Sequence, residues 1–292
     1  MKILITGADG QLGNELRLVL RDETLILGIW PQFDLEQPDV ERYVVEAGPD
    51  VVIHAAAYTN VDQAEREPDR AMRINADGTR RVAQAAAKVG AKFIYLSTDY
   101  VFDGRKRAPY VETDNPHPIN VYGRSKLQGE REAFARCPST LVIRTSWLYG
   151  PTGKNFVRTI LQLATEQPVL RVVADQRGCP THAGDLAGAI RQVLPLDLHG
   201  ILHIAGEGDC TWHEFACEIV SLMGLPVRVE PISTDDAGRL ARRPAYSVLS
   251  CRRLNDAGVR MPHWKEALAR FVSDVRSSKL TEKAFEVDTR GV

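Results

Sequence analysis

A glycine-rich turn follows the first apolar run of the chain and constrains the fold more than any other feature. Residues 2–5 read KILI, and Gly7, Gly10 and Gly13 follow with two residues between successive glycines. Glycine lets a backbone turn sharply and come close to a pyrophosphate. The helix that follows such a turn offers its free N–H groups to the phosphates. This spacing between an apolar strand and a helix predicts a dinucleotide-binding unit.

The first half of the chain alternates between apolar runs and helical stretches. The runs at 2–6, 24–30, 51–55, 93–97 and 141–145 predict buried parallel strands. The stretches at 12–21, 40–47 and 68–89 predict the helices between them. Repeated strand–helix units of this kind form a parallel sheet with helices on both faces.

The regular alternation of apolar runs and helical stretches ends at about residue 150. The pattern predicts helices at 155–165, 182–193, 212–223 and 262–275 and strands at 169–173 and 200–205. We therefore expect an α/β fold, a Rossmann-type doubly wound parallel sheet with a smaller C-terminal substrate-binding lobe. The sheet domain would span residues 1–148, with segments near 180–205 returning to it. The lobe would span 149–276, and residues 277–292 would form a loosely ordered tail.

Composition narrows the class of protein. The 292 residues include 44% hydrophobic and 26% charged residues, with a net charge of −1. A chain without an excess of positive charge has little to attract nucleic acid or an anionic membrane. No apolar run approaches the length of a membrane span. The five cysteines are scattered and form no C-x-x-C motif. We expect a cytoplasmic protein that needs no metal or disulfide.

A hydroxyl and a Tyr-x-x-x-Lys motif predict proton-transfer chemistry. Thr98 ends the apolar run at 93–97, and Tyr122 and Lys126 lie four residues apart, on one face of a helix. A cationic lysine, together with the positive nicotinamide, would lower the tyrosine pKa from its ordinary value near 10, so Tyr122 would act as a general acid as hydride arrives. Thr98 would hydrogen-bond the same substrate oxygen.

The coenzyme preference stays open at this stage, between NADPH and NADH. The run at 24–30 ends in Gly28-Ile29-Trp30, without the acid or base that would bind a ribose hydroxyl or a 2′-phosphate. Asp34 and Leu35 follow and would hold the adenine. The small residues Ala55, Ala56 and Ala57 would let a flat coenzyme pass over a strand end, although they also suit a plain buried terminus. Asn75, within the predicted helix at 68–89, is either an unremarkable polar residue or a support for the sheet near the site.

Longer strings resemble one family, the dTDP-4-dehydrorhamnose reductases, within the extended short-chain dehydrogenase/reductases. The strings are STDYVFDG at 97–104, NVYGRSK at 120–126 followed by Gly129-Glu130, and RTSWLYG at 144–150 followed by Asn155-Phe156. Two more lie in the predicted lobe, DQRGCPT at 175–181 and ARRPAYSVL at 241–249. The resemblance covers residues 1 to about 270.

The resemblance implies a role for each matching position. The catalytic trio would be Thr98, Tyr122 and Lys126. The coenzyme would contact Gly7, Gly10, Gln11, Leu12, Gly13, Asp34, Leu35, Ala55, Ala56, Ala57, Tyr58, Tyr122 and Lys126. The nucleotide sugar would contact Thr98, Asp99, Tyr100, Trp147, Asn155 and Arg243. An aromatic ring can pack on a sugar or base, and an arginine fork matches diphosphate oxygens.

One position departs from the family pattern. Some members are described as dimers that share magnesium through glutamates. Glu15 is present here, but the second acidic position is Gly184, with Asp185 beside it. We therefore predict no metal site, and a monomer or weak homodimer.

The implied activity is NAD(P)H-dependent reduction of the C4 ketone of dTDP-4-dehydro-L-rhamnose to dTDP-L-rhamnose. Two alternatives remain. Another nucleotide-sugar epimerase, reductase or dehydratase would share the fold, although a dehydratase favours an Asp-Glu pair where this chain has Asp99-Tyr100. A non-catalytic regulatory subunit of methionine adenosyltransferase would not need Thr98, Tyr122 and Lys126, all of which are intact.

Overall fold

The structure is a computed structural model that describes residues 1–277. Within that range the centre is a six-stranded parallel sheet with the order β10-β5-β4-β3-β1-β2. Its strands are β1 (Lys2–Thr6), β2 (Thr24–Gly28), β3 (Val51–His54), β4 (Lys92–Thr98), β5 (Thr140–Thr145) and β10 (Gly200–His203). The strand order reverses beside β1, and ligands of doubly wound sheets bind at such a reversal, beyond the carboxyl ends of the strands.

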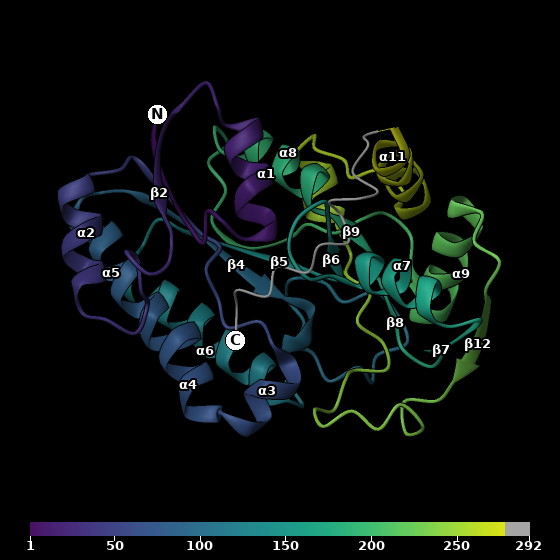
Figure 1. Ribbon diagram of the computed structural model, residues 1–292. Helices are drawn as coiled ribbons and strands as arrows, with labels where there is room; N and C mark the ends of the chain where they lie inside the picture. The colour runs from purple at the N-terminus through teal and green to yellow at the C-terminus, as the bar shows by residue number, and fades with distance from the viewer. Residues whose placement is uncertain (278–292) are drawn as a thin grey trace.

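Helices cover both faces of this sheet (Figure 1). One face packs against α1 (Gln11–Val19), α8 (Ala183–Val193) and α10 (Arg252–Asp256). The other packs against α2 (Asp39–Ala47), α5 (Thr79–Lys88) and α6 (Val121–Arg136). Burial on both sides explains why the strands read as continuous apolar runs. The predicted α/β fold with a Rossmann-type parallel sheet is confirmed.

A second core lies beside the sheet domain, on the right of Figure 1. Its helices are α7 (Phe156–Glu166), α9 (Trp212–Met223) and α11 (Trp264–Ser277). Its short strands pair as β7 (Val169–Val173) with β12 (Arg228–Ile232) and β8 (Arg177–Gly178) with β11 (Cys210–Thr211). Another short pair, β6 (Leu148–Tyr149) with β9 (Thr181–His182), links this region to the end of β5.

Helix α9 shows how local sequence sets its ends. Thr211 accepts a hydrogen bond from the backbone N–H of Glu214, whose carboxylate accepts one from the Thr211 N–H. This capping box begins the helix. Gly224 ends it in a left-handed conformation with φ 64°. The predicted bounds of this helix are confirmed.

The predicted long helix at 68–89 is wrong in its middle. The structure has α4 (Pro68–Met72), a π-helical segment η1 (Arg73–Gly78) and then α5. The side chain of Asn75, in the π segment, is hydrogen-bonded to Tyr58 and Ser125 rather than exposed on a helix face. Such tertiary bonds do not show in the sequence pattern, and π segments often mark functional regions.

The end of β2 and one additional helix also differ from expectation. Strand β2 ends at Gly28 rather than Trp30, because the Phe33 N–H donates to the Ile29 carbonyl and turns the chain. A short helix, α3 (Val61–Arg66), was not predicted; the side chain of Asn60 caps it by accepting from the Gln63 N–H. No helix within residues 1–277 is long and apolar enough to span a bilayer. The expected tail lies outside the described residues, apart from Ser277, which ends α11.

Candidate active site

A cavity of about 780 Å³ opens beyond the carboxyl ends of β1, β3, β4 and β5. Its size suits a ligand with several rings. Most of the predicted site residues line it, namely Gly7, Gly10, Gln11, Leu12, Gly13, Ala55, Ala56, Ala57, Thr98, Asp99, Tyr100, Tyr122, Lys126 and Trp147. The fold therefore brings three distant motifs of the sequence into one space.

The glycine turn forms the floor at the start of α1. Gly7 has φ +65°, and a Cβ there would lie 2.8 Å from Cα of Ala56. A Cβ on Gly13 would lie 2.1 Å from the carbonyl oxygen of Gly7. No side chain caps the N-terminus of α1 at Gly10. The turn thus leaves open backbone N–H groups at a helix N-terminus, which fits a coenzyme pyrophosphate.

The catalytic helix packs closely on the end of β4. Tyr122 and Lys126 lie one turn apart on α6, and Asn120 caps that helix by accepting from the Gly123 N–H at 2.7 Å. A Cβ on Gly123 would lie 2.1 Å from the carbonyl oxygen of Tyr100, so only glycine permits this approach. Thr98, the last residue of β4, accepts from the Tyr100 N–H at 3.2 Å.

Burial sets the protonation state of Tyr122. It raises the tyrosine pKa to about 12, against a smaller lowering by a hydrogen bond with Thr98. Lys126 is not among the groups that shift the Tyr122 pKa. Lys126 Nζ lies 4.2 Å from the ring centre of Tyr95, and burial lowers the lysine pKa to about 7. Burial therefore outweighs the other influences on the Tyr122 pKa, and the lowering assigned to Lys126 and to the nicotinamide stays a prediction.

Asp99 is a second buried acid in the cavity wall. Its side chain is 2% exposed, and Oδ1 accepts from the Thr98 hydroxyl at 3.1 Å. Oδ2 has no hydrogen-bond partner. Burial raises the Asp99 pKa to about 7, while the nearby polar groups of Ser247 and Thr98 oppose the shift. Asp99 Oδ2 thus lacks the hydrogen bond that most buried polar atoms make.

A buried ion pair supports this wall from behind. Arg144 donates to both oxygens of Glu130, at 2.9 Å and 2.7 Å, and Ser97 donates to Glu130 Oε1 at 2.5 Å. Both charged side chains are almost fully buried. The bidentate geometry fixes α6 against β4 and β5. Sequence reasoning missed this pair, although Glu130 and Arg144 lie within the family-like strings.

Five predicted site residues lie outside the lining of the cavity: Asp34, Leu35, Tyr58, Asn155 and Arg243. Asn155 caps α7 and donates to Gln11 Oε1 at 2.8 Å, so it ties the lobe to the glycine turn. Arg243 pairs with Asp62 at 2.8 Å. The ligand roles given to these five residues remain predictions.

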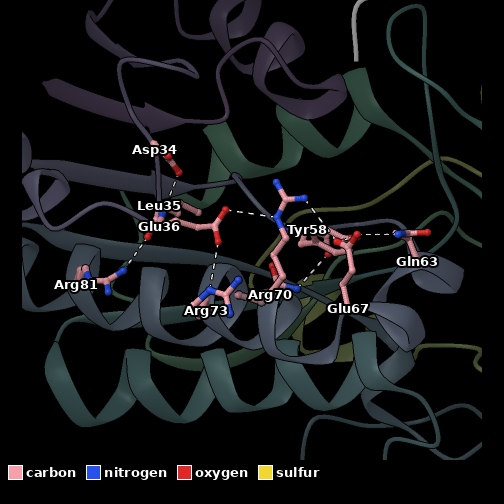
Figure 2. A network of polar contacts seen from close by, with 10 residues as sticks. Asp34, Leu35, Glu36, Tyr58, Gln63, Glu67, Arg70, Arg73 and Arg81 are labelled. Atoms are coloured by element: carbon pink, nitrogen blue, oxygen red, sulfur yellow. Dashed lines mark hydrogen bonds and ion pairs between the residues drawn. The ribbon is translucent and has the colours of Figure 1, made fainter. Parts of the chain in front are cut away.

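A charged network anchors the turn that carries Asp34 and Leu35 (Figure 2). The Glu36 carboxylate lies 3.4 Å from Arg70 and 3.3 Å from Arg73, which project from α4 and η1. Arg81 donates to the Leu35 carbonyl at 2.8 Å. The turn after β2 is therefore held against the helices that follow β3.

The same network continues to Tyr58, whose hydroxyl donates to Glu67 at 2.9 Å. Leu35 and Ala56 belong to one apolar cluster, so the turn at 34–35 and the alanine run pack on the same core. This placement suits the adenine role that we predict for that turn.

Several lining residues were not predicted, including Ser146, Lys154, Phe156 and Trp212. Lys154 and Phe156 flank the N-cap of α7, and Trp212 begins α9. In the sequence, the two aromatic residues read as ordinary members of amphipathic helices. Only the packing of the lobe on the sheet domain turns them toward the cavity.

Residues 1–277 contain no cluster of three or more histidine, cysteine, aspartate or glutamate side chains able to hold a metal ion. Asp185 is instead held by Arg270, which donates to both carboxylate oxygens at 2.8 Å and 2.7 Å. Glu15 lies near Gly184, His182 and Asp185, and burial raises its pKa.

The glycine turn and the Thr98–Tyr122–Lys126 set in one cavity define a nicotinamide-dependent oxidoreductase of Rossmann type. The sequence model of the family described as RmlD substrate binding domain matches residues 1–277, and this chain belongs to that family.

The chain is similar to known proteins along nearly its whole length. It is 42% identical over 286 residues to a dTDP-4-dehydrorhamnose reductase of Sinorhizobium fredii, covering 93% of this chain and 97% of that protein. It is 42% identical to the spore coat polysaccharide biosynthesis protein SpsK of Bacillus subtilis, covering 95% and 98%. The crystal structure of the dTDP-4-dehydrorhamnose reductase of Bacillus anthracis in complex with NADP superimposes with a TM-score of 0.91 at 42% identity, covering 94% of this chain and 99% of that one.

Proposed function

We propose that this protein reduces the C4 ketone of dTDP-4-dehydro-L-rhamnose to give dTDP-L-rhamnose, with NADPH or NADH as coenzyme. The observation that carries the proposal is the meeting of the glycine turn with Thr98, Tyr122 and Lys126 in one cavity. The family membership and the reductases among its relatives support the choice of substrate.

The glycine turn fits a dinucleotide. A Cβ at Gly7 would strike the backbone of Ala56, and one at Gly13 would strike the carbonyl oxygen of Gly7, so the tight turn that would receive the pyrophosphate needs glycine at both positions. Ala55, Ala56 and Ala57 would flank the nicotinamide half, and Lys126 would hold its ribose. A bound reduced nicotinamide supplies the hydride for C4.

Tyr122 is the proton donor in this proposal. Its raised pKa keeps the phenol protonated at neutral pH, the state from which it can give a proton to the forming alkoxide. Thr98 would hydrogen-bond the same oxygen. Asp99 would accept a hydrogen bond from a sugar hydroxyl through its unpartnered Oδ2. The diphosphate and base would provide binding energy away from the reacting carbon, and Arg243 would contribute to it.

The direct test follows oxidation of NADPH, and separately of NADH, by the purified protein with dTDP-4-dehydro-L-rhamnose. The UDP and GDP analogues serve as controls for the base. We expect stoichiometric dTDP-L-rhamnose, and the rate ratio gives the coenzyme preference. Coenzyme binding without turnover would contradict the proposed substrate and favour a different nucleotide sugar first and a regulatory subunit second. Purified protein that carries stoichiometric NAD would favour an epimerase.

The role of Tyr122 predicts the result of one substitution. Tyr122→Phe removes the proton donor but keeps the ring, so kcat should fall roughly 100-fold or more, while coenzyme affinity changes little. Steady-state kinetics and fluorescence titration with NADPH measure the two quantities. Near-normal turnover in this variant would refute the assignment. Tyr246→Phe, outside the cavity lining, is the matched control and should keep wild-type turnover.

A further inference from the structure

The backbone of Trp147 has an unusual conformation. It is the only non-glycine residue within 1–277 with a positive φ, at 47°. This region disfavours a bulky L-residue, and such strain persists only where the surroundings impose it, often at functional sites. Trp147 follows Thr145 by two residues, and Thr145 is the β5 partner of Thr98 in the sheet. The strained turn therefore places an indole beside the catalytic strand ends.

A second indole lies flat against the first. The ring centres of Trp147 and Trp212 are 3.4 Å apart, with 5° between the planes, and both residues line the cavity. Aromatic pairs left to themselves prefer offset or edge-to-face geometry, so neighbouring groups must hold this sandwich together. Phe156 is one of them, with its ring centre 4.5 Å from that of Trp212.

A glycine close to the indole of Trp147 belongs to the same arrangement. A Cβ on Gly178 would lie 2.5 Å from Cε2 of Trp147, so a side chain there would displace the indole. Gly178 pairs with Cys210 in the antiparallel ladder of β8 and β11, and Trp212 begins the helix that follows β11. One short ladder thus carries both the glycine that adjoins Trp147 and the indole stacked on it.

Charged groups secure that ladder to the start of α9. Arg177, the β8 partner of Thr211, lies 2.6 Å from Asp209 and 3.1 Å from Glu214. Glu214 is also the acidic member of the capping box with Thr211. These contacts fix the first turn of α9 and with it the position of Trp212.

We propose that Trp212 is a positioning residue that holds the indole of Trp147 against the apolar face of the sugar in the nucleotide-sugar substrate. A 6-deoxy sugar presents ring C–H groups and a methyl group, and a flat aromatic surface packs well against them. The inference rests on the proposed nucleotide-sugar function and adds a residue from the lobe to the substrate site. It predicts that Trp212 controls substrate affinity and has little effect on coenzyme affinity, because Trp212 belongs to the core of the lobe, whereas the predicted coenzyme site lies on the glycine turn and the alanine run.

The test compares substitutions at two residues that contact Trp147, Trp212 and Gly178. Trp212→Ala should raise KM for dTDP-4-dehydro-L-rhamnose about tenfold or more while the Kd for NADPH stays within twofold. Trp212→Phe keeps an aromatic support and should restore most of the loss. Gly178→Ala leaves Trp212 in place but displaces the indole of Trp147, so it should raise KM by a similar factor. If Trp212→Ala does not fold, Gly178→Ala replaces it as the test.

The control is Trp264→Phe, a change in the core of the same lobe, where Trp264 packs on Phe215 outside the cavity lining. It should leave KM within twofold of wild type. A KM for both Trp212→Ala and Gly178→Ala within twofold of wild type would overturn the inference, as would an equal rise in KM for Trp264→Phe. Wild-type turnover of the same substrate is measured first. Its absence would refute the proposed function, whereas its presence with unaffected variants would refute only the role of Trp212.

Discussion

At the scale of single residues, burial decides the chemistry of the site. Tyr122, Lys126 and Asp99 all lie in one cavity wall, and burial shifts each pKa toward the neutral form of the side chain. The wall therefore carries less charge at neutral pH than its residue types suggest. Such a wall suits a reaction in which a neutral ketone becomes an alkoxide that must take a proton.

Asp99 makes the pH dependence of stability testable. Its pKa is about 7 in the folded protein against an ordinary 3.8, so the folded state holds the proton more tightly than the unfolded chain. Raising the pH from about 4 to 7 therefore removes stability, by about 1.4 kcal/mol per pH unit at most. Between pH 5 and pH 7 the wild type should lose about 2 kcal/mol of unfolding free energy relative to Asp99→Asn, as measured by urea denaturation.

The comparison with Asp99→Asn cancels the contributions of all other titrating groups. Asp235→Asn, at an exposed position after β12, provides the control and should show the same pH dependence as wild type. If the difference between wild type and Asp99→Asn does not change with pH, the protonation assigned to Asp99 is wrong.

At the scale of elements, the site depends on how closely α6 approaches its neighbours. A Cβ on Gly129 would lie 2.2 Å from the hydroxyl of Tyr95 and 2.4 Å from the carbonyl oxygen of Asn75. The π-helical segment brings Asn75 to this contact, where its side chain accepts from the Tyr58 N–H at 2.8 Å and donates to Ser125 at 2.9 Å. Asn75 thus joins the exit of β3 to the catalytic helix.

Asn75→Ala tests that connection. It leaves the backbone N–H of Tyr58 without its partner in a part-buried setting, and an orphaned polar group costs about 1–3 kcal/mol. We expect the free energy of unfolding, from urea denaturation, to fall by that amount. Asn255→Ala, at an exposed position of α10, should cost much less. An equal fall in the free energy of unfolding of the two variants would show that Asn75 does not stabilise the contact between the exit of β3 and the catalytic helix.

How well each element could be predicted depends on how far apart in the sequence its interacting residues lie. The glycine turn and the capping box of α9 were predictable because their residues lie within a few positions of one another. The π segment was not predictable, because the partners of Asn75 are Tyr58 and Ser125, 17 and 50 residues away. Thr98 could be recognised from the sequence as a hydroxyl at the end of a strand. The buried surroundings that shift the pKa values of its neighbours could not.

At the scale of the whole molecule, the chain passes between the two cores more than once. It enters the lobe after β6, returns with α8 and β10, and leaves again for α9. Gln11 also accepts a hydrogen bond from Asn155, which joins the glycine turn to α7. We therefore expect the sheet domain and the lobe to unfold together.

Calorimetry with coenzyme tests this expectation. The protein should show one thermal transition, and NADPH at 100 times its Kd should stabilise the protein by about 2.7 kcal/mol and shift the entire transition upward. Gly13→Ala places a Cβ within 2.1 Å of the Gly7 carbonyl and should abolish most of the shift. A second transition that does not respond to NADPH would show that the lobe unfolds independently.

The sequence by itself determined the order along the chain of the six strands of the central sheet, most of the helices, the glycine turn and the choice of Thr98, Tyr122 and Lys126 as candidates, because these depend on local periodicity and on short motifs. The tertiary structure alone decided the environment of those residues. It placed Lys126 over Tyr95, left Asp99 Oδ2 without a partner and stacked Trp212 on Trp147. Burial and contact depend on which distant segments meet, and no pattern within one segment carries that information.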